Sequence, residues 1–129
     1  MASGRQYGPS NLVKTFAAGA DLSAAAKRFT FMKVSGVIAA TTAGAGEQPV
    51  GVLQGGAEAA RGIAVGLLGA GGGTTLKAGA AVTAGDLLKS DSTGRAVAAS
   101  AGQNFYAIAL ETVANADEYL EALLQSGRA

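Results

Sequence analysis

The stretch GEQPVGVL at residues 46–53, followed by GIAVGLL at 62–68, has a second copy in GQNFYAIA at 102–109 and EYLEALL at 118–124. The spacing between the two copies is constant, since position 46 corresponds to 102 and position 68 to 124. In each copy a glycine turn leads into a short apolar run, a polar link and a second apolar run. Repetition at a fixed spacing indicates one structural unit used twice. Apolar runs this short are typical of strands, so the sequence predicts a mainly β fold, a small β-barrel or β-tulip built from two similar halves.

The residues before the first copy predict further short elements. Residues 29–34 alternate in side-chain character, which predicts a strand ending near Gly36, and residues 37–42 are also β-prone. Residues 17–28 have two interpretations: Asp21 caps a short helix that runs through 24–26, or the segment is a loop. We therefore expect at most one or two short helices.

The residues around the second copy are clearer. A polar run with a glycine at 90–94 separates two apolar runs at 87–89 and 95–97, which predicts a β-hairpin. Residues 75–79 and 81–86 predict turns, and 106–110 predict a strand. Residues 114–125 contain good helix formers, but 119–124 match 63–68, where the flanking Gly62 and the internal Gly66 disfavour a helix. We therefore favour a strand.

Composition limits both the core and the chemistry. The 129 residues suffice for one domain, yet only 5% are aromatic and Ala and Gly are abundant, so each buried side chain removes little apolar surface from water. We expect modest stability for the lone chain, with further burial supplied by neighbouring subunits. The chain has no Cys and no His, which removes the commonest general base and the commonest metal ligands. A net charge of +1 is not that of a nucleic-acid binder.

Motifs that resemble catalytic or phosphate-binding sites fail on spacing. The glycine-rich residues 69–73 are not followed directly by the Lys-Ser/Thr of a phosphate loop, so a linker is the better interpretation. Ser10 and Lys14 are four residues apart, and so are Ser23 and Lys27, whereas the Ser-x-x-Lys signature requires three. The sequence therefore predicts no enzyme, no cofactor and no bound metal.

The sequence also shows no targeting or membrane segment. The first nine residues lack the apolar region of a signal peptide, and the longest apolar stretch, 63–70, is far shorter than the roughly 20 residues that span a bilayer. We expect a protein made in the cytoplasm, with neither a membrane nor a nucleic acid as direct partner.

The first 35 residues stand apart from the repeat. They contain five basic residues and a single acidic one, whereas the remainder has five basic and eight acidic residues. Glycines and a proline oppose regular structure in residues 1–16, which we interpret as an extended arm. The candidate contact residues on this arm are Arg5, Tyr7, Lys14 and Phe16, since its aromatic side chains have little local core to join. The alternatives are ordinary scatter of charge and two exposed aromatic side chains.

The spacing of the turns resembles a known family. LKAGAAVTAGDLL at 76–88, DSTGRAV at 91–97, the run at 109–110 and the closing strand at 119–124 resemble the capsid cement, or head decoration, proteins of tailed phages. The resemblance covers about residues 36–124. It implies a compact β-barrel or β-tulip body and homotrimers at three-fold positions on the capsid exterior, so the virion is the expected location. Such proteins bridge major capsid subunits and hold the head against internal pressure, and their N-terminal arm commonly pairs with a capsid strand.

Two domains of different role follow from this interpretation. Residues 1–35 are expected to form the arm and a lead-in strand, and residues 36–129 the body, with the repeat at 36–70 and 92–126. The alternative is another self-assembling structural β-subunit, from a tail, a fibre or a surface layer.

Overall fold

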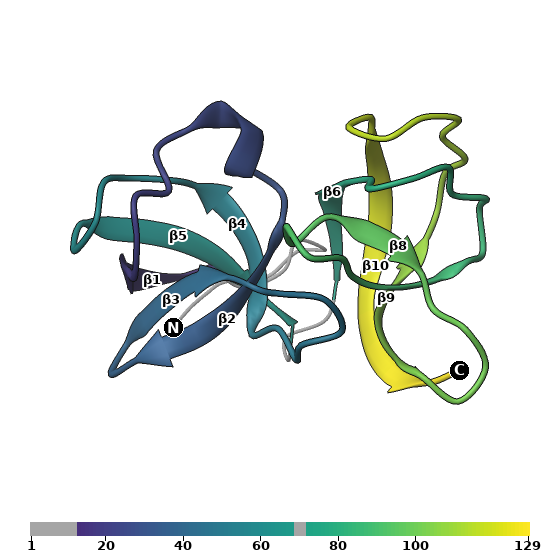
Figure 1. Ribbon diagram of the computed structural model, residues 1–129, viewed down its shortest axis with the longest axis horizontal. Coiled ribbons are helices and arrows are strands. Elements are labelled where there is room, and N and C mark those ends of the chain that lie inside the picture. The colour runs from purple at the N-terminus through teal and green to yellow at the C-terminus, as the bar shows by residue number, and fades with distance from the viewer. Residues whose placement is uncertain (1–12, 69–71) are drawn as a thin grey trace, which may run out of the picture.

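The protein is described by a computed structural model that covers residues 13–68 and 72–129 of the chain. The first half forms a closed five-stranded barrel with the strand order β1-β3-β2-β4-β5, in which β5 pairs with β1 to complete the circle (Figure 1). Its strands are β1 (Val13–Ala18), β2 (Phe31–Gly36), β3 (Ala39–Thr42), β4 (Gly51–Gly55) and β5 (Gly62–Leu67). A short 3-10 turn, η1 (Ala25–Lys27), precedes β2. We call these elements the first barrel.

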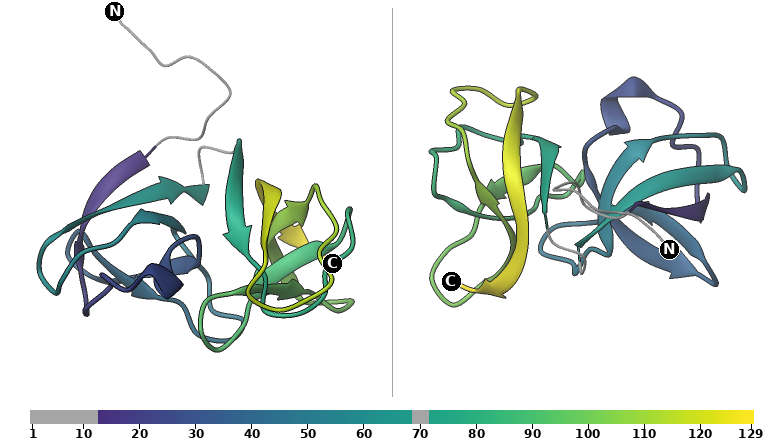
Figure 2. Two further views of the ribbon diagram at one scale, coloured as in Figure 1. Left: turned by 90° about the horizontal axis from the view of Figure 1, so that it is seen from above. Right: turned by 180° about the vertical axis from the view of Figure 1, so that it is seen from behind.

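The second half forms a five-stranded sheet with the order β6-β10-β9-β7-β8. Its strands are β6 (Gly73–Lys77), β7 (Leu87–Ser90), β8 (Ala96–Ala98), β9 (Asn104–Ala109) and β10 (Tyr119–Arg128). The views from above and from behind show this second sheet beside the first barrel (Figure 2). A mainly β fold with a small barrel, made of two similar halves, is thus confirmed.

The two halves share one topology. Replacing β1, β5, β4, β2 and β3 by β6, β10, β9, β7 and β8 reproduces every strand pairing of the first barrel except the contact of β1 with β3. The contact of β1 with β3 is parallel and begins where Ala17 pairs with Ala39. In the second half an isolated parallel bridge between Ala78 and Ala96 takes its place. The repeat therefore extends over five strands, two of which lie outside the repeated ranges that the sequence indicated.

The register of the central strands is also repeated. Phe31 faces Val52 in the first barrel, and Leu87 faces Ile108 in the second sheet, at the same spacing as the sequence repeat. The last strand departs from this spacing. Ile63 of β5 pairs with Phe16 of β1, and Leu120 of β10 pairs with Leu76 of β6, so Leu120 is the structural counterpart of Ile63. These two residues are one position further apart than the spacing of the sequence repeat. The constant spacing that the sequence indicated is therefore wrong by one position in the final strand.

Left-handed backbone residues repeat in the same way. Eight of the nine described residues with positive φ form four pairs. The pairs are Phe29 and Gly85, Ile38 and Gly94, Gly46 and Gly102, and Ala60 and Asp117. The first three pairs keep the spacing of the sequence repeat, and the fourth has the longer spacing of the last strand. Because non-glycine residues seldom adopt this conformation, Phe29, Ile38, Ala60 and Asp117 are held there by the repeated fold.

Backbone hydrogen bonds and a shared apolar core join the two halves. The N–H of Phe31 donates to the carbonyl of Gly94 at 2.7 Å, and the N–H of Lys77 donates to the carbonyl of Phe29 at 2.9 Å. Phe31, Ala43 and Val52 of the first barrel are fully buried in one apolar cluster with side chains of the second sheet. A second cluster fills the first barrel alone. The two halves therefore form one continuous body.

Most local predictions are confirmed, and three are wrong. The hairpin of β7 and β8, the strands β4, β5 and β9, and the strand at 119–124 are all present. Residues 75–77 belong to β6 instead of a turn, because they pair with β10. Phe29 is not in a strand, since its positive φ places it before β2 begins. Residues 13–16 are not part of an arm, because they pair with β5 as β1.

Candidate contact surfaces

A cleft of about 500 Å³ lies where the two halves meet, and charged side chains line it. Its lining includes Lys27, Lys77, Arg95 and Asp117. Arg95 binds Asp91 and Asp117, both at 3.0 Å, and the hydrogen bond to Asp117 followed by the charge of Asp91 raises the pKa of Arg95. The Nζ of Lys77, whose side chain is nearly buried, donates to the carbonyl of Ala26 at 3.0 Å. Arg95, Asp91 and Asp117 all belong to the second half, so among these contacts it is the bond from Lys77 to Ala26 that joins the two halves.

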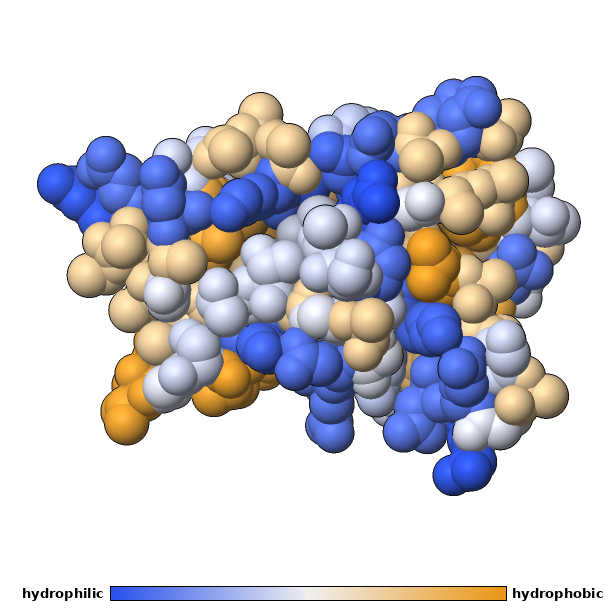
Figure 3. Space-filling model, viewed as in Figure 1, coloured by the Kyte–Doolittle hydropathy of each residue, from blue (hydrophilic) through white to orange (hydrophobic). Residues whose placement is uncertain are grey.

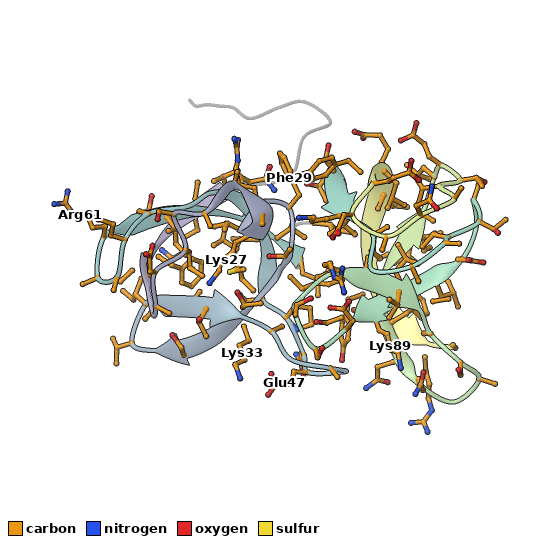
Figure 4. The ribbon with its side chains drawn as sticks, turned by 45° about the horizontal axis from the view of Figure 1, so that its top comes forward. Lys27, Phe29, Lys33, Glu47, Arg61 and Lys89 are labelled. Carbon is orange, nitrogen blue, oxygen red and sulfur yellow. The ribbon has the colours of Figure 1, made fainter. Side chains whose placement is uncertain are left out.

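An aromatic contact closes one side of this junction. The rings of Phe29 and Tyr119 meet edge to face with centroids 5.7 Å apart, and Figure 4 places Phe29 between the halves. The guanidinium of Arg28 lies 5.3 Å from the centroid of the Phe29 ring. Such aromatic and cation–π pairs contribute about 0.5–1.5 kcal/mol each beyond apolar burial. Tyr119 is half exposed, and this contact packs its ring against the first half of the chain.

An exposed ion pair braces the turn after β3. Lys33 donates to both carboxylate oxygens of Glu47, at 2.9 and 3.1 Å, and the N–H of Gly44 donates to the same carboxylate (Figure 4). The bond from Lys33, followed by that from Gly44, lowers the pKa of Glu47. Gly46 in this turn donates to the carbonyl of Ser90, so the ion pair supports a segment that contacts the second sheet.

The tip of the β2–β3 hairpin is apolar and exposed. Val34, Val37 and Ile38 are 60%, 94% and 58% exposed. Figure 3 shows strongly hydrophobic atoms at its lower left, where Figure 1 places this hairpin. Polar residues and glycine usually occupy such tips, so the apolar side chains indicate a contact surface. The sequence contained this signal, since Val37 and Ile38 directly follow Ser35-Gly36, but β-propensity alone does not distinguish a hairpin tip from a core strand.

The structure separates the four candidate contact residues. Lys14 is exposed on β1, whereas Phe16, on the same strand, is only 6% exposed and packs in the core of the first barrel. The expectation that Phe16 has little local core is therefore wrong, since Ile63 of β5 pairs with it. Arg5 and Tyr7 lie outside the described residues.

The described residues show no arrangement typical of metal binding. Within 13–68 and 72–129, no three His, Cys, Asp or Glu side chains are grouped closely enough to hold an ion. In the same part of the chain, no helix has the length and apolar character needed to span a bilayer.

Asp86 and Asp91 have the turn roles that the sequence predicts, since Asp86 accepts from the N–H of Thr83 and Asp91 from that of Thr93.

Comparison with known proteins supports the fold. No family model matches the chain, and no curated protein matches it. The chain is similar to a solved structure described as the head fiber gp8.5 N base in bacteriophage phi29, with 14% sequence identity and a TM-score of 0.69. The similarity covers 88% of this chain and 93% of that chain, so it includes both halves. The fold of the chain is therefore that of the base of a phage head fibre.

Proposed function

We propose that the chain is a structural protein of a tailed-phage head, a decoration or cement subunit that binds the outside of the shell and bridges major capsid subunits. The observation that carries the proposal is the fold, which is shared over nearly its whole length with the base of a phage head fibre. The resemblance in the spacing of turns between residues 76 and 124 supports the same class of protein.

The surface chemistry fits a role in assembly. Lys14 and the apolar tip of the β2–β3 hairpin are exposed, while Lys77 and Arg95 in the cleft are paired with Asp117. A decoration protein needs no catalytic residue, since many weak contacts multiplied by symmetry supply its affinity. On this proposal the chain works without enzymatic activity or a cofactor, as a homo-oligomer, and a trimer suits three-fold positions on a shell. It is made in the host cytoplasm and reaches the virion by binding the major capsid protein, without direct contact to nucleic acid or membrane.

The grip on the shell is assigned to the N-terminal residues. Arg5 and Tyr7 precede β1 in the sequence and Lys14 lies on it, so together they supply two positive charges and one aromatic ring. An aromatic anchor in a partner's groove is a common source of binding energy. Phe16 is removed from this set because it is buried.

A second candidate is the base of a fibre that projects from the head. The structural neighbour itself is the base part of a head fibre, and this observation favours that role. The two candidates differ in one respect, since only a fibre base carries a further projecting segment.

Binding to empty heads tests the proposal. Expanded heads made from the major capsid protein of the encoding phage are mixed with purified chain and sedimented. Co-sedimentation that saturates at a fixed ratio to the capsid protein supports the proposal, and a Tyr7→Ala variant is expected to bind less. A chain that stays in the supernatant, or that forms filaments by itself without binding heads, overturns it.

A further inference from the structure

Three of the six exposed large apolar side chains in residues 13–68 and 72–129 lie at the tip of the β2–β3 hairpin, namely Val34, Val37 and Ile38. Of the others, Val13 begins β1, Leu110 follows β9 and is 54% exposed, and Tyr119 packs against Phe29. Singly exposed apolar residues are normal, but a grouped set indicates a contact surface.

The junction between the halves shows how the corresponding surface of the second sheet is used within one chain. At that junction the second sheet presents Ser90, Thr93 and Gly94 of the β7–β8 hairpin, together with Thr74 of β6. Ser90 and Gly94 accept hydrogen bonds from the first barrel, and Thr93 lines the cleft. The hydroxyl of Thr74 accepts from the side-chain amide of Gln54 at 3.1 Å.

The repeat maps these junction residues onto the exposed apolar side of the first barrel. Ser90, Thr93 and Gly94 correspond, at the spacing of the repeat, to the three tip residues Val34, Val37 and Ile38. Thr74 corresponds to Lys14, as the pairing of β1 with β5 and of β6 with β10 shows. We call Lys14, Val34, Val37 and Ile38 the leading face.

The repeat also locates the surface that such a face would cover. In the first barrel, Phe31, Ala43 and Val52 are fully buried beneath the second sheet. Their counterparts in the second half are Leu87, Ala99 and Ile108, which are only half-buried, and the counterpart of Gln54 is the exposed Leu110. We call these four residues the trailing face. On the first barrel the corresponding apolar surface is covered by the second sheet, whereas on the second sheet it is open.

We propose that the leading face of one copy packs on the trailing face of a second copy, repeating between chains the contact that joins the halves within one chain. The contact is head to tail, so it leaves one free face at each end until a ring closes. The aliphatic stem of Lys14 would lie on Leu110, as Thr74 lies on Gln54, and its ammonium would meet Asp86 and Glu111 beside the trailing face. The inference deepens the self-association in the proposed function and rests on it.

Two single substitutions test the contact on the free protein, without capsids. Val37→Asp places a charge on the leading face, and Leu110→Asp does so on the trailing face. Ala59→Asp is the matched control, because Ala59 is exposed and lies on neither face. Sedimentation velocity over a wide concentration range gives the mass of each variant, and circular dichroism checks its fold.

The outcome depends on the head-to-tail arrangement. The wild type and Ala59→Asp are expected to form oligomers, whereas each face variant alone is expected to stay at the 12.5 kDa of the monomer. Mixing the two variants should give a one-to-one dimer, because each retains the face that the other has lost. A monomeric wild type, a folded face variant that still assembles like the wild type, or a mixture that stays monomeric would overturn the proposal. Head binding by a chain that remains monomeric would overturn this contact alone and leave the proposed function standing.

Discussion

The backbone N–H of Phe31 donates to the carbonyl oxygen of Gly94 at 2.7 Å, and this bond ties the first barrel to the β7–β8 hairpin of the second sheet. Gly94 has φ +81°, and a Cβ at this position would lie 3.0 Å from the carbonyl oxygen of Phe31 and 2.8 Å from Cγ2 of Thr42. The junction between the halves therefore depends on a residue without a side chain.

Replacing Gly94 by alanine should weaken the protein more than its backbone conformation alone explains. We expect Gly94→Ala to lower the free energy of unfolding by about 2–4 kcal/mol, since left-handed strain adds to a forced separation of the halves. Gly102→Ala is the control, because Gly102 has φ +85° with open space around it, and its cost should be about 1–2 kcal/mol. Urea denaturation of both variants measures the difference, and equal losses would contradict the role of the junction.

At Ala60 a substitution by glycine is expected to stabilise the protein. It adopts φ +68°, which is costly for a residue with a Cβ, and it is exposed. Ala60→Gly should therefore raise the free energy of unfolding by up to about 1 kcal/mol, since relief of strain outweighs the added chain entropy. The neighbouring Ala59→Gly should instead lower it by about 0.5–1 kcal/mol. Thermal unfolding of the two variants shows whether each one gains or loses stability. A loss of stability in both would argue against left-handed strain at Ala60.

Glu47 predicts a dependence of stability on pH. Its bonds to Lys33 and Gly44 hold its pKa below the ordinary value of 4.5, so folding favours the charged form. The contribution is present above that value and is lost as the pH falls through the lower folded pKa. Glu47→Gln should remove this part of the acid dependence while leaving the slope at neutral pH unchanged. Denaturation between pH 7 and about pH 3 compares the two proteins, and identical acid profiles would show that the pair contributes nothing.

Two truncations separate the N-terminal residues from the barrel. Deleting residues 1–12 removes Arg5 and Tyr7 but no part of β1, so the barrel should stay folded while head binding weakens. Deleting residues 1–16 also removes Phe16, a core side chain that pairs with Ile63, and should destabilise the barrel by several kcal/mol. Circular dichroism and head sedimentation together report both effects. Full head binding after the shorter deletion would contradict the role given to Arg5 and Tyr7.

The sequence predicted those parts of the fold whose pattern is local. The β7–β8 hairpin was readable because a polar run with Gly94 separates two apolar runs, and β10 was readable because it matches β5. The strand β1 was missed because Val13, Lys14 and Thr15 are all exposed and only Phe16 and Ala18 reach the core, through pairing with distant strands.

A signal for the full repeat was nevertheless present. Residues 18–20 and 78–80 both read Ala-Gly-Ala, each followed by a buried apolar residue, Leu22 or Val82. The contact faces were harder to predict. The spacing of the repeat already matches Ile38 with Gly94 and Gln54 with Leu110, but it does not show which of these residues lie at the junction between the halves and which are exposed.

A reconstruction of the virion of the encoding phage by cryo-electron microscopy, beside that of a mutant phage lacking this chain, tests the assignment to the head most directly. We expect two-lobed density of the size of this fold on the outer surface of wild-type heads, at symmetric positions between capsid subunits, and no such density on the mutant. Heads that are identical with and without the chain would show that it is not a head protein.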